Sequence, residues 1–177
     1  MLYRRTTGFK GPLAFDVTVD QAKLPNVLVL VVKSFRFWDS LYMNENSTIS
    51  EAMKQHHLSV TPNFDRWAKR GVAFNNMWSS WQTSRLLESI LFGQIPLDSV
   101  TETGTTYGRE DTKLSGMPQF FKQKGYETVF TTGCTIKYDQ WDRFLPSHGF
   151  DTVLGEREIR ALAEKEFGIS PSDWYNL

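Results

Sequence analysis

Residues 82–85 bring together the side chains that a phosphate- or sulfate-binding site uses. Thr83 and Ser84 supply hydroxyl groups, and Arg85 supplies a guanidinium. Apolar residues follow at helical spacing, at Leu86, Leu87, Ile90 and Leu91. The pattern predicts a helix over residues 83–92, whose free N–H groups and dipole at the N-terminus favour an anion. The alternative is that Thr83 or Ser84 only caps this helix.

A hydroxyl group at this position is a weak nucleophile by itself. A general base or a bound divalent cation must activate it before it attacks an ester. A nucleophilic Thr83 would therefore need a metal ion that carboxylates of neighbouring loops hold. Histidines offer less. His56 and His57 are predicted to be solvated residues of a polar loop, and His148 is predicted to shape the turn before Phe150.

The segments before this group predict a strand, a helix and a second strand. Residues 27–32 are an unbroken run of valine and leucine, typical of a strand covered on both faces of a parallel sheet. Thr61 and Pro62 predict the N-cap and first turn of a helix that ends near Gly71. Residues 72–74 predict the strand that follows it.

The order of helix, glycine and strand is repeated after residue 115. A helix that includes Met117 is predicted to end at Gly125, and residues 127–132 predict the following strand. A charged helix is predicted over residues 156–166. The repetition indicates an α/β fold. Because ligands bind beyond the carboxyl ends of parallel strands, the loops after the three predicted strands are expected to converge on one site.

The composition excludes several classes of function. The 20 basic and 20 acidic residues cancel, so no overall field attracts nucleic acid, which is not a predicted partner. The single cysteine, Cys134, excludes an internal disulfide framework. No apolar run is long enough for a transmembrane segment, and no signal peptide is recognisable.

The domain organisation expected from the sequence is simple. Residues 1–24 are predicted to be a lead-in segment, and residues 25–177 to form one partial domain. The sequence stops directly after an aromatic cluster at residues 174–175, which we interpret as truncation of the domain.

Five groups of residues occur in the order found in one known family. They are Asn26 to Phe35; Thr61-Pro62-Asn63-Phe64-Asp65 with Arg70 to Phe74; Gln82-Thr83-Ser84; Gly125 to Phe130; and Trp141-Asp142-Arg143 with His148-Gly149-Phe150-Asp151. In this order the chain resembles the sulfatase and lipoteichoic-acid-synthase branch of the alkaline-phosphatase superfamily, which includes phosphoglycerol and phosphoethanolamine transferases. The resemblance implies a three-layer α/β/α sandwich with a mainly parallel sheet, of which this chain is the incomplete N-terminal part.

The resemblance also implies a metal-dependent phosphotransferase or a phosphate- or sulfate-ester hydrolase. Thr83 would be the nucleophile and a ligand of a divalent cation, Mn²⁺, Mg²⁺ or Ca²⁺. Ser84, Arg85, Trp141 and Arg143 would bind the substrate, and a planar guanidinium suits a bidentate contact with phosphate. The alternatives are that Trp141 packs in the core and that Arg143 forms a surface ion pair. Cys134 does not occupy the place of the modified cysteine of formylglycine sulfatases.

The resemblance also implies which partners the protein has and where in the cell it acts. The substrate would be a phosphate or sulfate ester, such as a lipid headgroup or a glycan, and the domain would need its missing C-terminal half. The complete protein would be extracytoplasmic and anchored to the membrane.

Two departures from the family pattern limit the activity expected of this chain. Lys33 stands where the family has an acidic metal ligand, and an ammonium group offers a cation no lone pair. The Asp-His pair that completes the family's metal site is also absent from these 177 residues. The chain is therefore expected to be inactive alone and to bind no cation. The alternatives are a non-catalytic pseudoenzyme or anion-binding module, in which Lys33 replaces the metal's charge, and a fragment without independent function.

Overall fold

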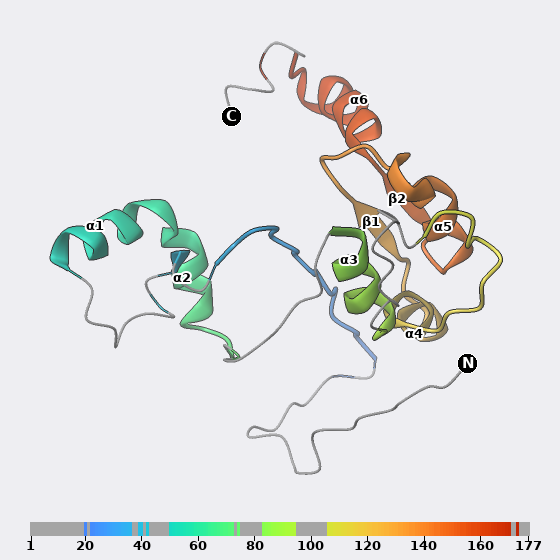
Figure 1. Ribbon diagram of the computed structural model, residues 1–177, viewed down its shortest axis with the longest axis horizontal. Coiled ribbons are helices and arrows are strands. Elements are labelled where there is room, and N and C mark those ends of the chain that lie inside the picture. Colours follow the sequence, from blue (N-terminus) through green and yellow to red (C-terminus); the bar gives the residue numbers. More distant parts are fainter. Residues whose placement is uncertain are drawn as a thin grey trace, which may run out of the picture. The chain divides into compact units, whose positions relative to one another are not determined.

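The computed structural model describes residues 20, 22–36, 39–40, 42, 50–72, 74, 83–94, 106–170 and 173 (Figure 1). The chain divides into two compact units, Met1–Asp65 and Arg66–Leu177. Each unit is described by itself below.

The first unit contains helix α1, Glu51–Val60, and the beginning of helix α2, Pro62–Ala68. The polar loop predicted around His56 and His57 is wrong, because both residues belong to α1.

Pro62 occupies the first position of α2, where its missing N–H is not needed. The buried carboxylate of Asp65 accepts hydrogen bonds from the hydroxyls of Ser40 (2.6 Å) and Thr61 (3.0 Å). These bonds fix the start of α2 to the segment around Ser40. The helix predicted to begin at Pro62 is confirmed, whereas the Thr61 hydroxyl donates to Asp65 and to the Asp39 carbonyl.

The apolar run of residues 27–32 does not form the predicted strand. It lies outside any helix or strand, and its side chains are between 43% (Val31) and 80% (Leu28) exposed. Such a run becomes a buried strand when neighbouring strands take its backbone hydrogen bonds and helices cover both faces. The strands paired among the described residues are β1 and β2, so the run lacks those neighbours.

The second unit contains the other elements of the fold. They are α3 (Thr83–Phe92), α4 (Met117–Gln123), β1 (Val129–Thr131), the 3₁₀ helix η3 (Tyr138–Gln140), α5 (Trp141–Ser147), β2 (Thr152–Leu154) and α6 (Glu156–Phe167). The helices predicted over residues 83–92 and 156–166 are confirmed. In the predicted strand at 72–74, residue 73 lies outside the described residues, and Val72 and Phe74 belong to no regular element.

The two strands form a small parallel sheet. Val129 pairs with Thr152, Phe130 with Val153 and Thr131 with Leu154. Helix α5 provides the crossover between them and packs on β2, as Figure 1 shows. Helices combined with a parallel sheet make this an α/β fold, as predicted.

The core of the second unit lies between α3, α5 and the sheet. Its buried apolar residues are Leu91, Phe92, Leu114, Trp141, Phe144 and Leu145. The buried face of α3 differs from the predicted one, because it includes Ser84, Arg85 and Glu88 beside Leu91 and Phe92, whereas Ile90 is exposed. The first two turns of α3 therefore direct polar side chains inward.

Candidate active site

Helix α3 begins at Thr83, the residue predicted to be the nucleophile. The Thr83 side chain is partly buried, whereas Ser84 and Arg85 are buried. At the first helical position, backbone N–H groups lack partners within the helix and can bind an anion. Gln82 lies outside the described residues. The structure thus places Thr83, Ser84 and Arg85 together in the first turn.

Ser84 connects this turn to the segment that follows β1. Its hydroxyl donates a hydrogen bond to Asp139 Oδ2 at 2.5 Å and accepts one from Trp141 Nε1 at 3.3 Å. Asp139 and Trp141 belong to η3 and α5, which follow the carboxyl end of β1. The segment that follows β1 is therefore joined to the N-terminus of α3, and loops after sheet strands are where ligand sites of α/β folds lie.

Asp139 and Gln140 have unusual backbone conformations next to this contact. Both lie in the left-handed region, with φ of 54° and 56°. This region costs about 1–3 kcal/mol for a residue other than glycine. The conformation is held by Thr106, whose hydroxyl donates to the Asp139 carbonyl at 2.6 Å, and by Gly108, whose N–H donates to Gln140 Oε1 at 3.0 Å.

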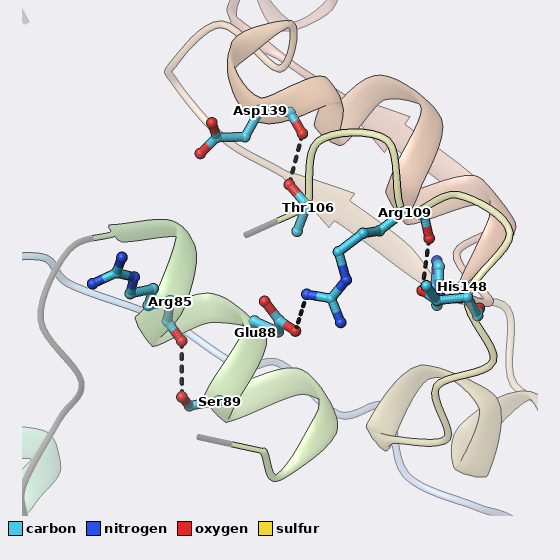
Figure 2. A network of polar contacts seen from close by, with 8 residues as sticks. Arg85, Glu88, Ser89, Thr106, Arg109, Asp139 and His148 are labelled. Atoms are coloured by element: carbon cyan, nitrogen blue, oxygen red, sulfur yellow. Dashed lines mark hydrogen bonds and ion pairs between the residues drawn. The ribbon is translucent and has the colours of Figure 1, made fainter. Parts of the chain in front are cut away.

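A buried ion pair lies one turn further along α3 (Figure 2). The Glu88 carboxylate, 1% exposed, accepts a hydrogen bond from Arg109 Nη1 at 2.8 Å. Glu88 Oε2 has no hydrogen-bond partner among the described residues. Breaking such a pair leaves a buried charge uncompensated and is costly. The pair therefore fixes loop 106–115 to α3.

The sequence-based analysis missed Glu88, Asp139 and Arg109. A signal for Glu88 was present, because Ser84 and Glu88 are four residues apart and share one face of the predicted helix. Asp139 and Arg109 gave no such signal, since their partners are 55 and 21 residues distant in the chain.

Trp141 and Arg143 lie in different environments. The Trp141 ring is buried and stacks on Phe130, with ring centroids 6.2 Å apart and an interplanar angle of 14°. Arg143 is exposed, and residues two positions apart on a helix point in nearly opposite directions. Trp141 therefore packs in the core and supports Ser84, and the two side chains do not share a surface.

Lys33 belongs to the first unit. It lies in an exposed turn beside Ser34, whose φ is 61°. The contact between Lys33 and Thr83 that the sequence indicates stays a prediction.

The described residues do not assemble a metal site. Within them, no group of three or more His, Cys, Asp or Glu side chains is placed to hold a metal ion. Cys134 is exposed in the loop after β1. Among the described helices, none has the length and apolar character that crossing a membrane requires.

The comparisons with known proteins agree with the α/β fold. The Sulfatase family profile matches residues 25–167, well over half of the chain. Comparisons with curated proteins and with solved structures found no match. Members of this family have an alkaline-phosphatase-like α/β fold, act on sulfate or phosphate esters, generally use a divalent metal ion and are often extracytoplasmic. The chain belongs to the sulfatase family.

Proposed function

We propose that the protein transfers or hydrolyses phosphate or sulfate esters with Thr83 as its nucleophile. Its motifs favour the lipoteichoic-acid-synthase and phosphoethanolamine-transferase branch, and thus a membrane-anchored enzyme acting outside the cytoplasm on a lipid headgroup or glycan. The observation that carries the proposal is the fixed first turn of α3, in which Thr83 precedes a serine bonded to Asp139 and Trp141.

The chemistry is a displacement at phosphorus or sulfur. Thr83 Oγ1 would form a bond to that atom while the bond to the ester oxygen breaks, and the proton lost by the threonine would end on the departing alcohol. Water or an acceptor alcohol would then displace Thr83 and return a proton to it. The exposed N–H groups at the start of α3 would bind the oxyanion during both steps.

Asp139 and Trp141 act in this proposal as positioning residues. A nucleophile works only when its attacking atom is held close to the reacting centre, and small displacements reduce the rate strongly. The bonds to Ser84 limit rotation and translation of the first turn. The backbone of Thr83 is then held in one position at the start of the helix.

A divalent cation would supply charge neutralisation and activation of the hydroxyl. The described residues do not fit such a cation by themselves, because they contain no group of three or more His, Cys, Asp or Glu side chains placed to hold it. Lys33 replaces an acidic residue at the family's first ligand position. For this reason we expect an appreciably slower reaction than in a protein with glutamate at position 33.

Lys33 also supports a second candidate function, that of an anion-binding protein without turnover. An exposed ammonium group is a suitable partner for phosphate or sulfate, and it needs no metal. Binding that persists in the presence of a chelator would favour this function over the enzymatic one.

The test compares the turnover rates of variants of the full gene product. The substrates are aryl phosphate and aryl sulfate, and Mn²⁺ is present. The unmodified protein is expected to show little turnover, and Lys33→Glu is expected to increase it. Adding Thr83→Ala to Lys33→Glu should abolish the gain, since the nucleophile is removed.

Ser89→Ala is the matched control, because Ser89 is a hydroxyl residue of the same helix whose Oγ donates to the Arg85 carbonyl at 2.8 Å. It should retain the turnover of Lys33→Glu. Turnover that survives Thr83→Ala would show that another group is the nucleophile. A Lys33→Glu protein that binds Mn²⁺ without turnover would overturn the enzymatic proposal.

A further inference from the structure

Residues 106–109 form a short segment that binds two elements around the start of α3. The Thr106 hydroxyl donates a hydrogen bond to the Asp139 carbonyl at 2.6 Å, and Arg109 Nη1 donates to Glu88 Oε1 at 2.8 Å. Asp139 belongs to η3 and Glu88 belongs to α3. We call this segment bracket 106–109, because one end holds η3 and the other holds α3 (Figure 2).

The two elements that bracket 106–109 holds are also bonded to each other. The Ser84 hydroxyl of α3 donates to Asp139 Oδ2 at 2.5 Å. Each of the three segments is therefore bonded to the other two. In such a closed set of bonds, one segment cannot shift unless a bond breaks or the other two segments move with it.

The hydroxyl groups in this set of bonds are shielded from water. Thr106 is 0% exposed and Ser84 is 4% exposed. Water cannot replace a hydrogen bond that is lost at such a position, so the loss leaves a buried polar group without a partner. Because Thr106 is completely buried, it cannot touch a substrate, and any effect it has on a reaction must pass through its contacts.

The bond from Thr106 acts on the backbone that directs the Asp139 carboxylate. The Asp139 carbonyl belongs to the peptide between Asp139 and Gln140, whose φ angles are 54° and 56°. A residue other than glycine persists in this left-handed region only where its surroundings hold it. The Thr106 hydroxyl supplies that hold, together with the Gly108 N–H, which donates to Gln140 Oε1 at 3.0 Å. The carboxylate of the restrained Asp139 then accepts the hydrogen bond from Ser84.

We propose that Thr106 is a positioning residue for the nucleophile Thr83, and that it acts through Asp139 and Ser84. The inference rests on the proposed function, since it takes Thr83 as the residue that forms the covalent bond. Ser84 follows Thr83 directly in the first turn of α3, so a shift of Ser84 moves the backbone of Thr83. A small displacement of the attacking atom lowers the rate of the chemical step strongly, whereas binding of the ester changes little.

The kinetic test compares Thr106→Val and Thr106→Ser in the full gene product carrying Lys33→Glu, with aryl phosphate and Mn²⁺. Valine keeps the shape of threonine and removes the hydroxyl, whereas serine keeps the hydroxyl. Thr106→Val is expected to lower kcat at least about tenfold and to leave KM within about twofold. Thr106→Ser is expected to retain most of the turnover.

Thr128→Val is the matched control for a loss of stability without a loss of positioning. The Thr128 hydroxyl is also buried and donates to a backbone carbonyl at 2.6 Å, that of Gly149, but it lies outside bracket 106–109. Thr128→Val should lower the temperature of thermal unfolding and leave kcat unchanged. Equal losses of kcat in Thr128→Val and Thr106→Val would show that Thr106 contributes only to stability, and would overturn the proposal.

A second measurement does not depend on turnover. The Trp141 indole N–H donates to Ser84 Oγ at 3.3 Å, so its hydrogen exchange reports on the position of Ser84. The ¹H–¹⁵N signal of this indole is assigned with Trp141→Phe. Thr106→Val is expected to accelerate its exchange about fivefold, the effect of one hydrogen bond. Thr106→Ser and Thr128→Val should keep the exchange rate of the parent protein.

The two measurements separate the positioning role of Thr106 from the reaction itself. A Lys33→Glu protein without turnover would contradict the proposed function, and the exchange of the Trp141 indole would then decide whether Thr106 holds Ser84. Unchanged exchange in Thr106→Val would overturn the positioning role. Accelerated exchange with an unchanged kcat, in a Lys33→Glu protein that turns over, would overturn it as well.

Discussion

At the scale of residues, Thr83 and Ser84 are neighbouring hydroxyl residues with different surroundings. Ser84 is buried and bonded on both sides, to a carboxylate and to an indole N–H. Thr83 is only partly buried, at the end of the helix where anions bind best. These different surroundings suit a structural role for Ser84 and a chemical role for Thr83.

Lys33 is the residue on which metal binding by this protein depends in our proposal. Replacing it by glutamate exchanges a repelling ammonium for an oxygen ligand that Mn²⁺ accepts. We expect Lys33→Glu to raise Mn²⁺ affinity at least tenfold, or ~1.4 kcal/mol. Calorimetric titration of the full gene product measures this affinity. Lys113→Glu is the control, because Lys113 is also exposed and its replacement by glutamate changes the charge by the same amount. Equal affinities of the Lys33→Glu and unmodified proteins would place residue 33 away from the metal site.

The sequence was sufficient to predict that Thr83 begins a helix, but not which residues hold that first turn in place. Hydroxyls, an arginine and helical spacing are local signals, and α3 begins where they indicated. The partner of Ser84 could not be predicted, because Asp139 is far away in sequence and has a left-handed backbone that no local pattern announces. Trp141 bonds to Ser84 and its ring lies in the core, and its predicted contact with the substrate stays a prediction.

At the scale of elements, α3 and α4 meet where only a glycine fits. A Cβ on Gly116 would lie 2.2 Å from the Leu91 carbonyl oxygen and 2.7 Å from Phe92 Cδ1. Gly116→Ala is therefore expected to reduce the free energy of unfolding by about 1–3 kcal/mol, measured by urea denaturation. Gly133→Ala is the control, because a Cβ there has nothing within 4 Å. Equal stability of the two variants would show that α3 and α4 are not in close contact.

Asp151 connects the segment before β2 to the start of β1 and to α4. Its carboxylate forms an ion pair with Lys122 and accepts hydrogen bonds from the Thr128 N–H and hydroxyl. The hydrogen bond from Lys122, followed by those from Thr128, lowers the pKa of Asp151 to about 2. This stabilisation is complete above the unfolded-state pKa, roughly 4, and is lost as the pH falls toward 2.

Asp151→Asn should therefore flatten the acid side of the stability profile, measured by thermal unfolding between those pH values. Asp142→Asn, which removes an exposed carboxylate of α5, should leave the profile unchanged. An unchanged acid slope in Asp151→Asn would mean that other carboxylates cause the acid sensitivity.

Local signals were sufficient to predict helices but not every strand. Helix α6 begins at Glu156 and ends before Gly168, whose φ is 64°, close to the predicted bounds. The strand predicted at residues 127–132 is present as the shorter β1. Residues 27–32 have the composition of a central strand, but a strand forms only through hydrogen bonds to neighbours, which composition does not provide.

At the scale of the whole molecule, the family is established and the reaction is proposed. The Sulfatase match spans residues of both compact units, from residue 25 to residue 167. The absence of net charge agrees with a small, local anion site rather than a binding surface for a polyanion. The central claim is that the local site acts through a covalent bond to Thr83.

Mass spectrometry of the protein stopped during turnover tests this claim most directly. The full gene product carrying Lys33→Glu would be mixed with aryl phosphate and Mn²⁺, quenched in acid and digested. We expect a phosphoryl group on Thr83, which should be absent from Thr83→Ala and present in Ser89→Ala. A phosphoryl group on Ser84 or another residue, or turnover without any labelled residue in the Thr83 peptide, would contradict it.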